Sequence, residues 1–192
     1  MRKILIAAVA TMLMAPMAHA AGENDAAIRK LVDSTFKVWT SDPLVIDAIR
    51  SQNKANSGLT QSDIDALDKK WRAEIGASAK PMINEMLDRP ASKKLAGFKN
   101  GGEGLFTEIF VMDNHGLNVA QSDATSDYWQ GDEAKWKKTF LAGRDVVFVD
   151  EVEFDDSTQT YQAQVSLAIA DPDNGAVIGA ITIGVNVELL TD

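Results

Sequence analysis

The sequence predicts an α+β fold in which N-terminal helices pack on a five- to six-stranded antiparallel sheet. Apolar residues recur at three- and four-residue spacing up to about residue 98, as on one face of a helix. After Gly101-Gly102, β-branched and aromatic residues dominate, as in strands. Turn sequences separate most of these later segments, and short connections imply antiparallel neighbours.

The first twenty residues have the three regions of a secretory signal peptide. Arg2 and Lys3 precede an apolar run over 4–14, and Ala18-His19-Ala20 is a small-x-small cleavage site. The run is shorter than the roughly 20 apolar residues of a membrane-spanning helix, which disfavours an uncleaved anchor. We therefore expect residues 1–20 to be removed on export and residues 21–192 to form one domain in the periplasm with no further membrane span.

The composition argues against several classes of protein. The chain has 19 Lys and Arg against 28 Asp and Glu, and the loss of Arg2 and Lys3 would take the net charge from −9 to −11. This negative charge disfavours binding to nucleic acid, whose phosphates are negative as well. The absence of cysteine excludes disulfides and thiol catalysis. His115 has no partner at metal-ligand spacing, and the Asp171 turn lacks the glycine and glutamate positions of a calcium loop. We expect no metal, no cofactor and no enzymatic activity.

Caps and prolines divide the helical half. Ser41-Asp42-Pro43 supplies a cap followed by proline at the first helical position, so one helix ends near Trp39 and another begins. Thr60 with Asp63 three residues later resembles a capping box. The predicted helices cover 25–39, 43–55, 60–75, 81–87 and, for a turn or two, 91–98.

The second half contains strand-like segments at 105–112, 117–122, 146–154, 160–170 and 176–187, with a longer insertion at 123–143 and a helix expected over about 132–140. Alternation within the strands separates two faces. Apolar side chains share one face of each strand, and small or polar side chains share the other. In the segment 160–170 the apolar set is Tyr161, Val165, Leu167 and Ile169, and the other set is Gln162, Gln164, Ser166 and Ala168. In the segment 176–187 the apolar set is Val177, Ile181, Ile183 and Val185, and the other set is Ala180, Thr182, Gly184 and Asn186. We expect the apolar face to pack on the helices and the polar face to leave a space.

An ordered series of motifs resembles the Cache family. The series comprises Asp113-x-x-Gly116, Asn118-Val119-Ala120-Gln121-Ser122, a tryptophan-bearing helix, Phe154-Asp155-Asp156-Ser157-Thr158, the hairpin residues Ser166, Ile169 and Asp171, and Ile178-Gly179-Ala180-Ile181. Cache domains, also called PDC sensor domains, are PAS-like extracytoplasmic ligand binders. The resemblance covers the chain from Asp25 to Val187.

The resemblance implies a small-molecule pocket between one face of the sheet and the segment after the second strand. Family members usually belong to transmembrane receptors in signal transduction, whereas we expect a free-standing periplasmic form here. Members that bind amino acids carry an arginine before a Trp-Tyr pair in the pocket helix. This chain has Lys135 before Trp136, so that mode of binding is not supported.

The predicted ligand contacts centre on the insertion. Tyr128 and Trp129, flanked by amide and carboxylate groups, suit a ligand cover, and the alternative is a loop plug in which Trp129 fills the open face of the sheet. Trp136 is either a pocket wall or core, and the polar strand residues are either a pocket floor or a solvated face. The resemblance assigns Asp156 a contact with a ligand amine, although turns favour aspartate for its own hydrogen bonds. The full predicted set is Tyr128, Trp129, Gln130, Trp136, Asp156, Gln164, Ser166 and Thr182.

These observations favour a non-enzymatic periplasmic sensor or solute-binding protein that holds a small organic ligand. A membrane receptor or another periplasmic protein is a candidate partner. The alternative is a ligand-free interaction module whose open face is covered by its own aromatics or by another protein. A hydrolase is least favoured, because the sequence offers no paired nucleophile and base.

Overall fold

The N-terminal segment is a continuous helix with a π-helical turn. The computed structural model describes residues 20–156 and 158–191, so the predicted signal peptide lies outside the described residues except for Ala20. Helix α1 (Ala20–Leu31) continues through the π turn η1 (Val32–Phe36) into α2 (Lys37–Trp39). Its apolar stripe, which includes Ile28 and Phe36, is buried, as predicted for 25–39.

Two predicted helix starts are confirmed in atomic detail. Asp42 accepts a hydrogen bond from the backbone N–H of Leu44 (2.9 Å) at the start of α3 (Pro43–Ala55). Helix α4 (Gln61–Ile75) begins with a complete capping box, in which Thr60 N donates to the carboxylate of Asp63 (2.9 Å) and Asp63 N donates to the Thr60 hydroxyl (3.3 Å).

The next two helices meet at a proline. Helix α5 (Pro81–Asp88) ends before Arg89, whose backbone is extended, and α6 (Pro90–Gly101) starts directly after it. The prediction of a stop before Pro90 is confirmed, but α6 is longer than the predicted turn or two. Proline tolerates the first helical position because that N–H has no helical partner.

Six antiparallel strands form one sheet in the order β2-β1-β6-β5-β3, with β4 also paired to β5. The strands are β1 (Phe106–Met112), β2 (Asn118–Gln121), β3 (Val147–Val149), β4 (Glu153–Asp155), β5 (Thr160–Ala170) and β6 (Val177–Asn186). The predicted fold class is therefore confirmed.

The predicted strand 146–154 is two short strands. β3 pairs with the middle of β5 and β4 with its start. Between them, the side chain of Asp150 accepts a hydrogen bond from the N–H of Glu151 (3.0 Å), a local bond that competes with the ladder. The expected helix 132–140 is also shorter, because α7 covers only Ala134–Lys137.

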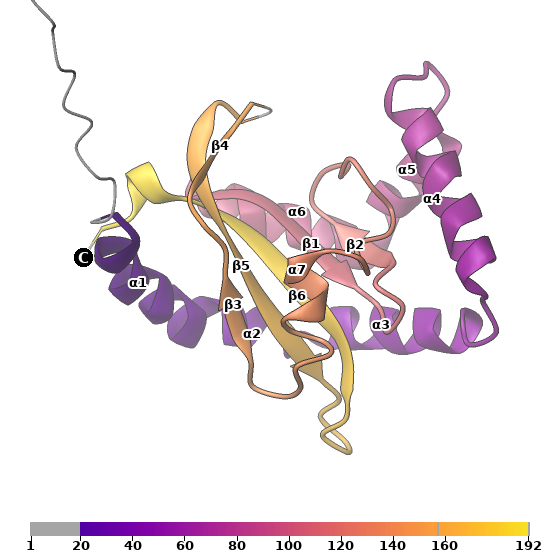
Figure 1. The fold of residues 1–192 in the computed structure, drawn as a ribbon, viewed down its shortest axis with the longest axis horizontal. Helices are drawn as coiled ribbons and strands as arrows, with labels where there is room; N and C mark the ends of the chain where they lie inside the picture. The colour runs from indigo at the N-terminus through magenta and orange to yellow at the C-terminus, as the bar shows by residue number, and fades with distance from the viewer. Residues whose placement is uncertain (1–19, 157, 192) are drawn as a thin grey trace, which may run out of the picture.

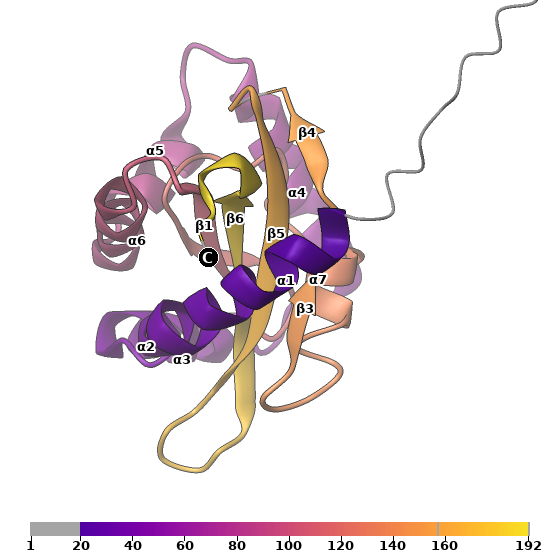
Figure 2. The same cartoon turned by 90° about the vertical axis from the view of Figure 1, so that its left-hand side faces the viewer.

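The two faces of the sheet differ as the alternation predicted. Val165, Leu167 and Ile169 pack with Ile181 and with residues of α3 and α6 in the main core; we call this side the helical face. We call the other side, which α7 covers, the open face. Figure 2 shows the sheet nearly edge-on, with α3 and α6 on one side and α7 on the other.

Tyr161 departs from the predicted pattern. It was expected on the packed face, but its side chain is 48% exposed and meets Phe154 edge-to-face at 5.2 Å. The reason is that the β4–β5 hairpin extends past α1, α3 and α6 at one end of the sheet (Figure 1). In the part of the chain that the structure describes, no helix is both long enough and apolar enough to cross a membrane.

Candidate functional site

Trp136 fills the centre of the open face. Its indole packs with Phe110, Met112 and Ala180 of the sheet, stacks on Phe140 at 4.9 Å, and donates a hydrogen bond to the backbone oxygen of Asp113 (3.1 Å). Only 9% of its surface is exposed. Trp136 is therefore a core residue in this structure, which is one of the two roles that the sequence left open.

Ser166 and Thr182 lie side by side on the same face. Their hydroxyls share a hydrogen bond of 2.9 Å, and both residues are fully buried. Buried hydroxyls require such a partner, because an unpaired one would lose its hydrogen bonds to water without compensation. The two residues belong to the polar face as predicted, but they line none of the described hollows.

A hollow of about 340 Å³ remains beside α7, above the first half of β5. Its walls come from three segments: the start of α7, the link between β3 and β4, and β5. The lining residues are Glu133, Ala134, Lys135, Asp150, Glu151, Glu153, Gln162 and Gln164. Its size falls at the lower end of the range for small-molecule sites.

Two glutamines form the floor of the hollow. Gln164 Nε2 donates to Glu108 Oε1 (2.7 Å), and Gln162 Oε1 accepts from the Thr107 hydroxyl. These bonds fix both amides and leave Gln164 Oε1 and Gln162 Nε2 without a hydrogen-bond partner among the described residues. The floor therefore offers an acceptor and a donor at fixed positions.

The charges around the hollow are mostly negative. Burial raises the pKa of Glu108, against the lowering effects of the Gln164 hydrogen bond and the Lys135 charge. Lys135 is the one cation among the lining residues and forms an ion pair with Glu133 (2.8 Å). Asp150, Glu151 and Glu153 add three more carboxylates, so the hollow favours a ligand with a positive group.

Sequence reasoning missed Glu108, Lys135 and Gln162 as site residues. Gln162 shares the alternation of Gln164, and Glu108 is the only charged residue in the strand Phe106–Met112. An acidic residue inside an apolar strand was the available signal. Its contact with Gln164, however, depends on how β1 and β5 both pair with β6.

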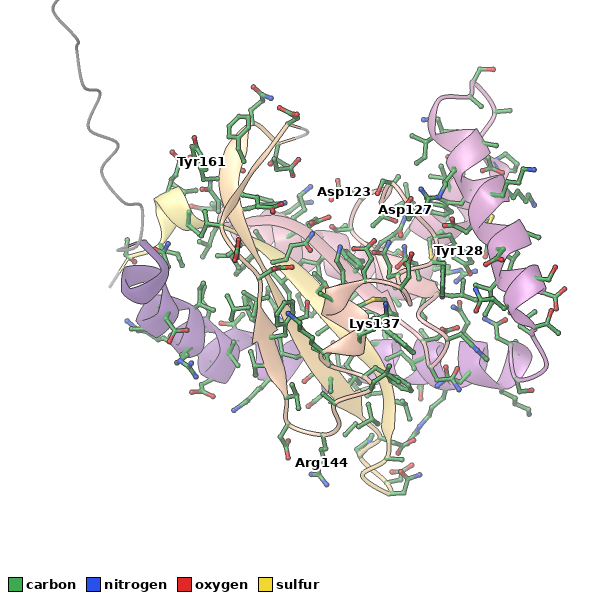
Figure 3. All side chains as sticks on the ribbon, in the orientation of Figure 1. Asp123, Asp127, Tyr128, Lys137, Arg144 and Tyr161 are labelled. Carbon is green, nitrogen blue, oxygen red and sulfur yellow. The ribbon has the colours of Figure 1, made fainter. Side chains whose placement is uncertain are left out.

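Tyr128 lies away from the hollow. Its ring stacks on Trp71 of α4 (5.5 Å between centroids) in a second apolar cluster with Ile83, Met86 and Leu117. Its backbone N–H donates to Asp68 of α4 (2.9 Å). Figure 3 shows Tyr128 on the side of α4, apart from Lys137 on α7.

The other predicted contacts are also dispersed. Trp129 is half-buried and donates to the backbone oxygen of His115 (2.8 Å), Gln130 is buried and donates to the backbone oxygen of Asp127 (3.0 Å), and Asp156 is exposed in the β4–β5 turn. The structure thus brings only Gln164 of the predicted set to the hollow, with Trp136, Ser166 and Thr182 on the same face. Ligand contacts by these eight residues stay predictions.

Solved structures are similar to this one. No family model matches the sequence, and no curated protein is similar to it. The extracellular domain of vpHK1S-Z8, a protein assigned as a histidine kinase, superposes with a TM-score of 0.51 at 11% identity over 88% of this chain and 55% of that chain. The sensor domain of the Vibrio cholerae histidine kinase DctB gives 0.45 at 11% identity, over 86% of this chain and 55% of that chain.

The ligand-binding domain of the Campylobacter jejuni chemoreceptor Tlp3, in complex with 4-methylisoleucine, gives a TM-score of 0.41 at 14% identity, over 79% of this chain and 63% of that chain. This chain therefore spans between 55% and 63% of the length of these three structures. The superposition on vpHK1S-Z8 shows that the chain shares the fold of that extracellular domain, in agreement with the α+β architecture that the Cache resemblance implies.

Proposed function

We propose that this chain is a non-enzymatic periplasmic sensor protein that binds a small polar organic molecule in the hollow beside α7. The observation that carries the proposal is the floor formed by Gln162 and Gln164, whose amides are fixed by Thr107 and Glu108 and still offer free hydrogen-bonding groups. Binding sites generally combine a concave surface with a few fixed polar groups of this kind.

The surrounding charge favours a ligand that carries an amine. A cation in the hollow would lie near Asp150, Glu151 and Glu153, and charge-assisted hydrogen bonds to carboxylates are about twice as strong as neutral ones. It would also lower the pKa of Glu108, because a nearby positive charge stabilises the ionised carboxyl. The ion pair of Lys135 with Glu133 supplies a donor for a second, negative group of the ligand.

Ligand-dependent stabilisation tests the proposal. A panel of small amines, amino acids and carboxylates is added to the purified protein, and the melting temperature is measured. A ligand at about 100 times its Kd adds about 2.7 kcal/mol, or roughly 5–10 °C for a chain of this size. Gln164→Ala should weaken binding about tenfold, whereas Gln61→Ala, at an exposed glutamine of α4, should leave it unchanged.

Absence of stabilisation by any compound, or equal stabilisation of the Gln164→Ala variant, would contradict a site in the hollow. Mass spectrometry of small molecules released from the purified protein would identify the ligand class directly. The export part of the proposal is tested separately, because protein recovered from the periplasm should begin at Ala21, whereas an intact Met1 on membrane-bound material would indicate an anchor.

The exposed aromatic pair on the β4–β5 hairpin favours a second candidate, an interaction module that binds no small molecule. Phe154 and Tyr161 are each 48% exposed and lie edge-to-face, and Val152, two residues before Phe154, is also exposed. Clusters of exposed apolar side chains commonly mark protein-interaction sites. Replacing both aromatics with serine should then abolish binding to a periplasmic partner, and no small molecule should raise the melting temperature of the unaltered chain.

A further inference from the structure

A second concave region lies on the other side of the molecule. This groove of about 540 Å³ runs between α3, the α5–α6 junction and β2, and it shares no lining residue with the hollow beside α7. Ala48, Ala91 and Val119 form its apolar walls, and the half-exposed Leu44 lies at its mouth. The groove is therefore wide and apolar enough to hold an aliphatic chain.

Arg89 is held in a fixed position at this groove. Its Nη1 donates to the backbone oxygen of Val119 (3.0 Å) and to Gln52 Oε1 (3.0 Å), while Gln52 Nε2 is itself bound to Asp113 (3.0 Å). Its Nε and Nη2 donate to Glu85, whose side chain is mostly exposed. An exposed ion pair contributes little to stability, so a ligand carboxylate can replace Glu85 at small cost.

Tyr128 supplies the second polar group. Its side chain is 5% exposed and lines the groove, yet its hydroxyl has no hydrogen bond to any described residue. Burial raises the pKa of Tyr128 to about 12, while the nearby charge of Arg89 opposes that rise. The hydroxyl therefore stays protonated at neutral pH and is available as a donor in the same groove as the guanidinium.

We propose that this groove binds an amphipathic monocarboxylate, with its carboxylate on Arg89 and the Tyr128 hydroxyl and its apolar chain along Ala48, Ala91 and Leu44. Both polar groups are donors, so they match an anion better than an amine or an alcohol. Apolar residues line the same groove as these donors, so affinity should depend on chain length. This site is independent of the ligand proposed for the hollow.

Calorimetric titration with straight-chain monocarboxylates from four to ten carbons tests the proposal, with alcohols and amines of equal length as comparisons. We expect saturable binding of the carboxylates, strengthening about three- to fourfold for each added methylene until the groove is full. Alcohols and amines should bind at least tenfold more weakly. Equal binding of carboxylates and alcohols would overturn the proposal, as would the absence of saturable binding at millimolar carboxylate.

Two substitutions address the groove itself. Tyr128→Phe keeps the ring on Trp71 and removes only the hydroxyl, so carboxylate affinity should fall about tenfold while the melting temperature changes little. Leu44→Glu places a negative charge at the mouth, on an exposed position in the first turn of α3, and should weaken binding further. Tyr161→Phe, at the other tyrosine, is the matched control and should bind as the unaltered chain does. Unchanged affinity in both Tyr128→Phe and Leu44→Glu would place the carboxylate elsewhere.

Discussion

Truncation of Trp136 tests whether its side chain is part of the packed core on the open face of the sheet or forms the wall of a ligand pocket there. Trp136→Ala removes a buried indole, its stacking with Phe140 and its hydrogen bond to the Asp113 carbonyl. Large-to-small changes of this kind cost about 3–5 kcal/mol in a packed core, and loss of an aromatic pair adds about 0.5–1.5 kcal/mol beyond area. We therefore expect the free energy of unfolding to fall by about 4–5 kcal/mol.

Urea denaturation followed by circular dichroism measures the change as a shift of the midpoint at constant slope. Trp136→Phe, which keeps a stacking ring and loses the N–H, should cost about 1–2 kcal/mol. Trp129→Ala is the matched control, because Trp129 is only half-buried and should cost less than Trp136→Ala. A loss below about 1 kcal/mol for Trp136→Ala would refute the packing argument and favour the other predicted role of Trp136, a pocket wall.

Three further predictions concern single contacts. Thr60→Ala removes half of the capping box with Asp63 and should lower the free energy of unfolding by about 1 kcal/mol in urea denaturation; no change would mean that the box is not formed in solution. The hydrogen bonds from Arg50 lower the pKa of Asp171 in the folded chain. The stability that Asp171 contributes is therefore complete above its unfolded pKa of about 3.9 and is lost as the pH falls through the folded pKa. Asp171→Asn should remove this step from a profile of unfolding free energy between pH 6 and 2. Since burial raises the pKa of Tyr128 to about 12, one of the two tyrosines should ionise late in an ultraviolet titration, and Tyr128→Phe should abolish that late step. The stability that Tyr128 contributes should be complete below about pH 10 and should be lost as the pH approaches 12.

The helices and faces of the sheet could be predicted because their signals are local. The cap at Asp42 and the box at Thr60 and Asp63 satisfy the first N–H groups of their own helices, so neighbouring residues decide where the helices begin. The alternation of Val165, Leu167 and Ile169 likewise fixes their face of the sheet. Tyr161 shows the limit of this reasoning, because its exposure depends on how far the hairpin extends past the helices.

The sites could not be predicted because they depend on the path of the insertion. After β2 the chain turns toward α4, where Asp68 accepts hydrogen bonds from the N–H groups of Tyr128 and Trp129. The two aromatics therefore pack in the apolar cluster beside α4 and not on the open face of the sheet, where they were expected from the sequence. Only the later part of the insertion reaches that face, with Trp136, and no local pattern distinguishes these two destinations.

Asp113 connects the two proposed sites. Its backbone oxygen accepts the hydrogen bond of Trp136, the residue directly after the Lys135 that lines the hollow. Its buried carboxylate accepts from Gln52 and Asn56 at the end of α3. Gln52 in turn holds Arg89 at the groove. The carboxylate is fully buried, and the N–H groups of His115 and Leu117 donate to it as well, so that its charge is compensated. Asp113 therefore contacts α7 through its backbone and α3 through its side chain, and a movement of α7 would act on the residue that fixes the end of α3.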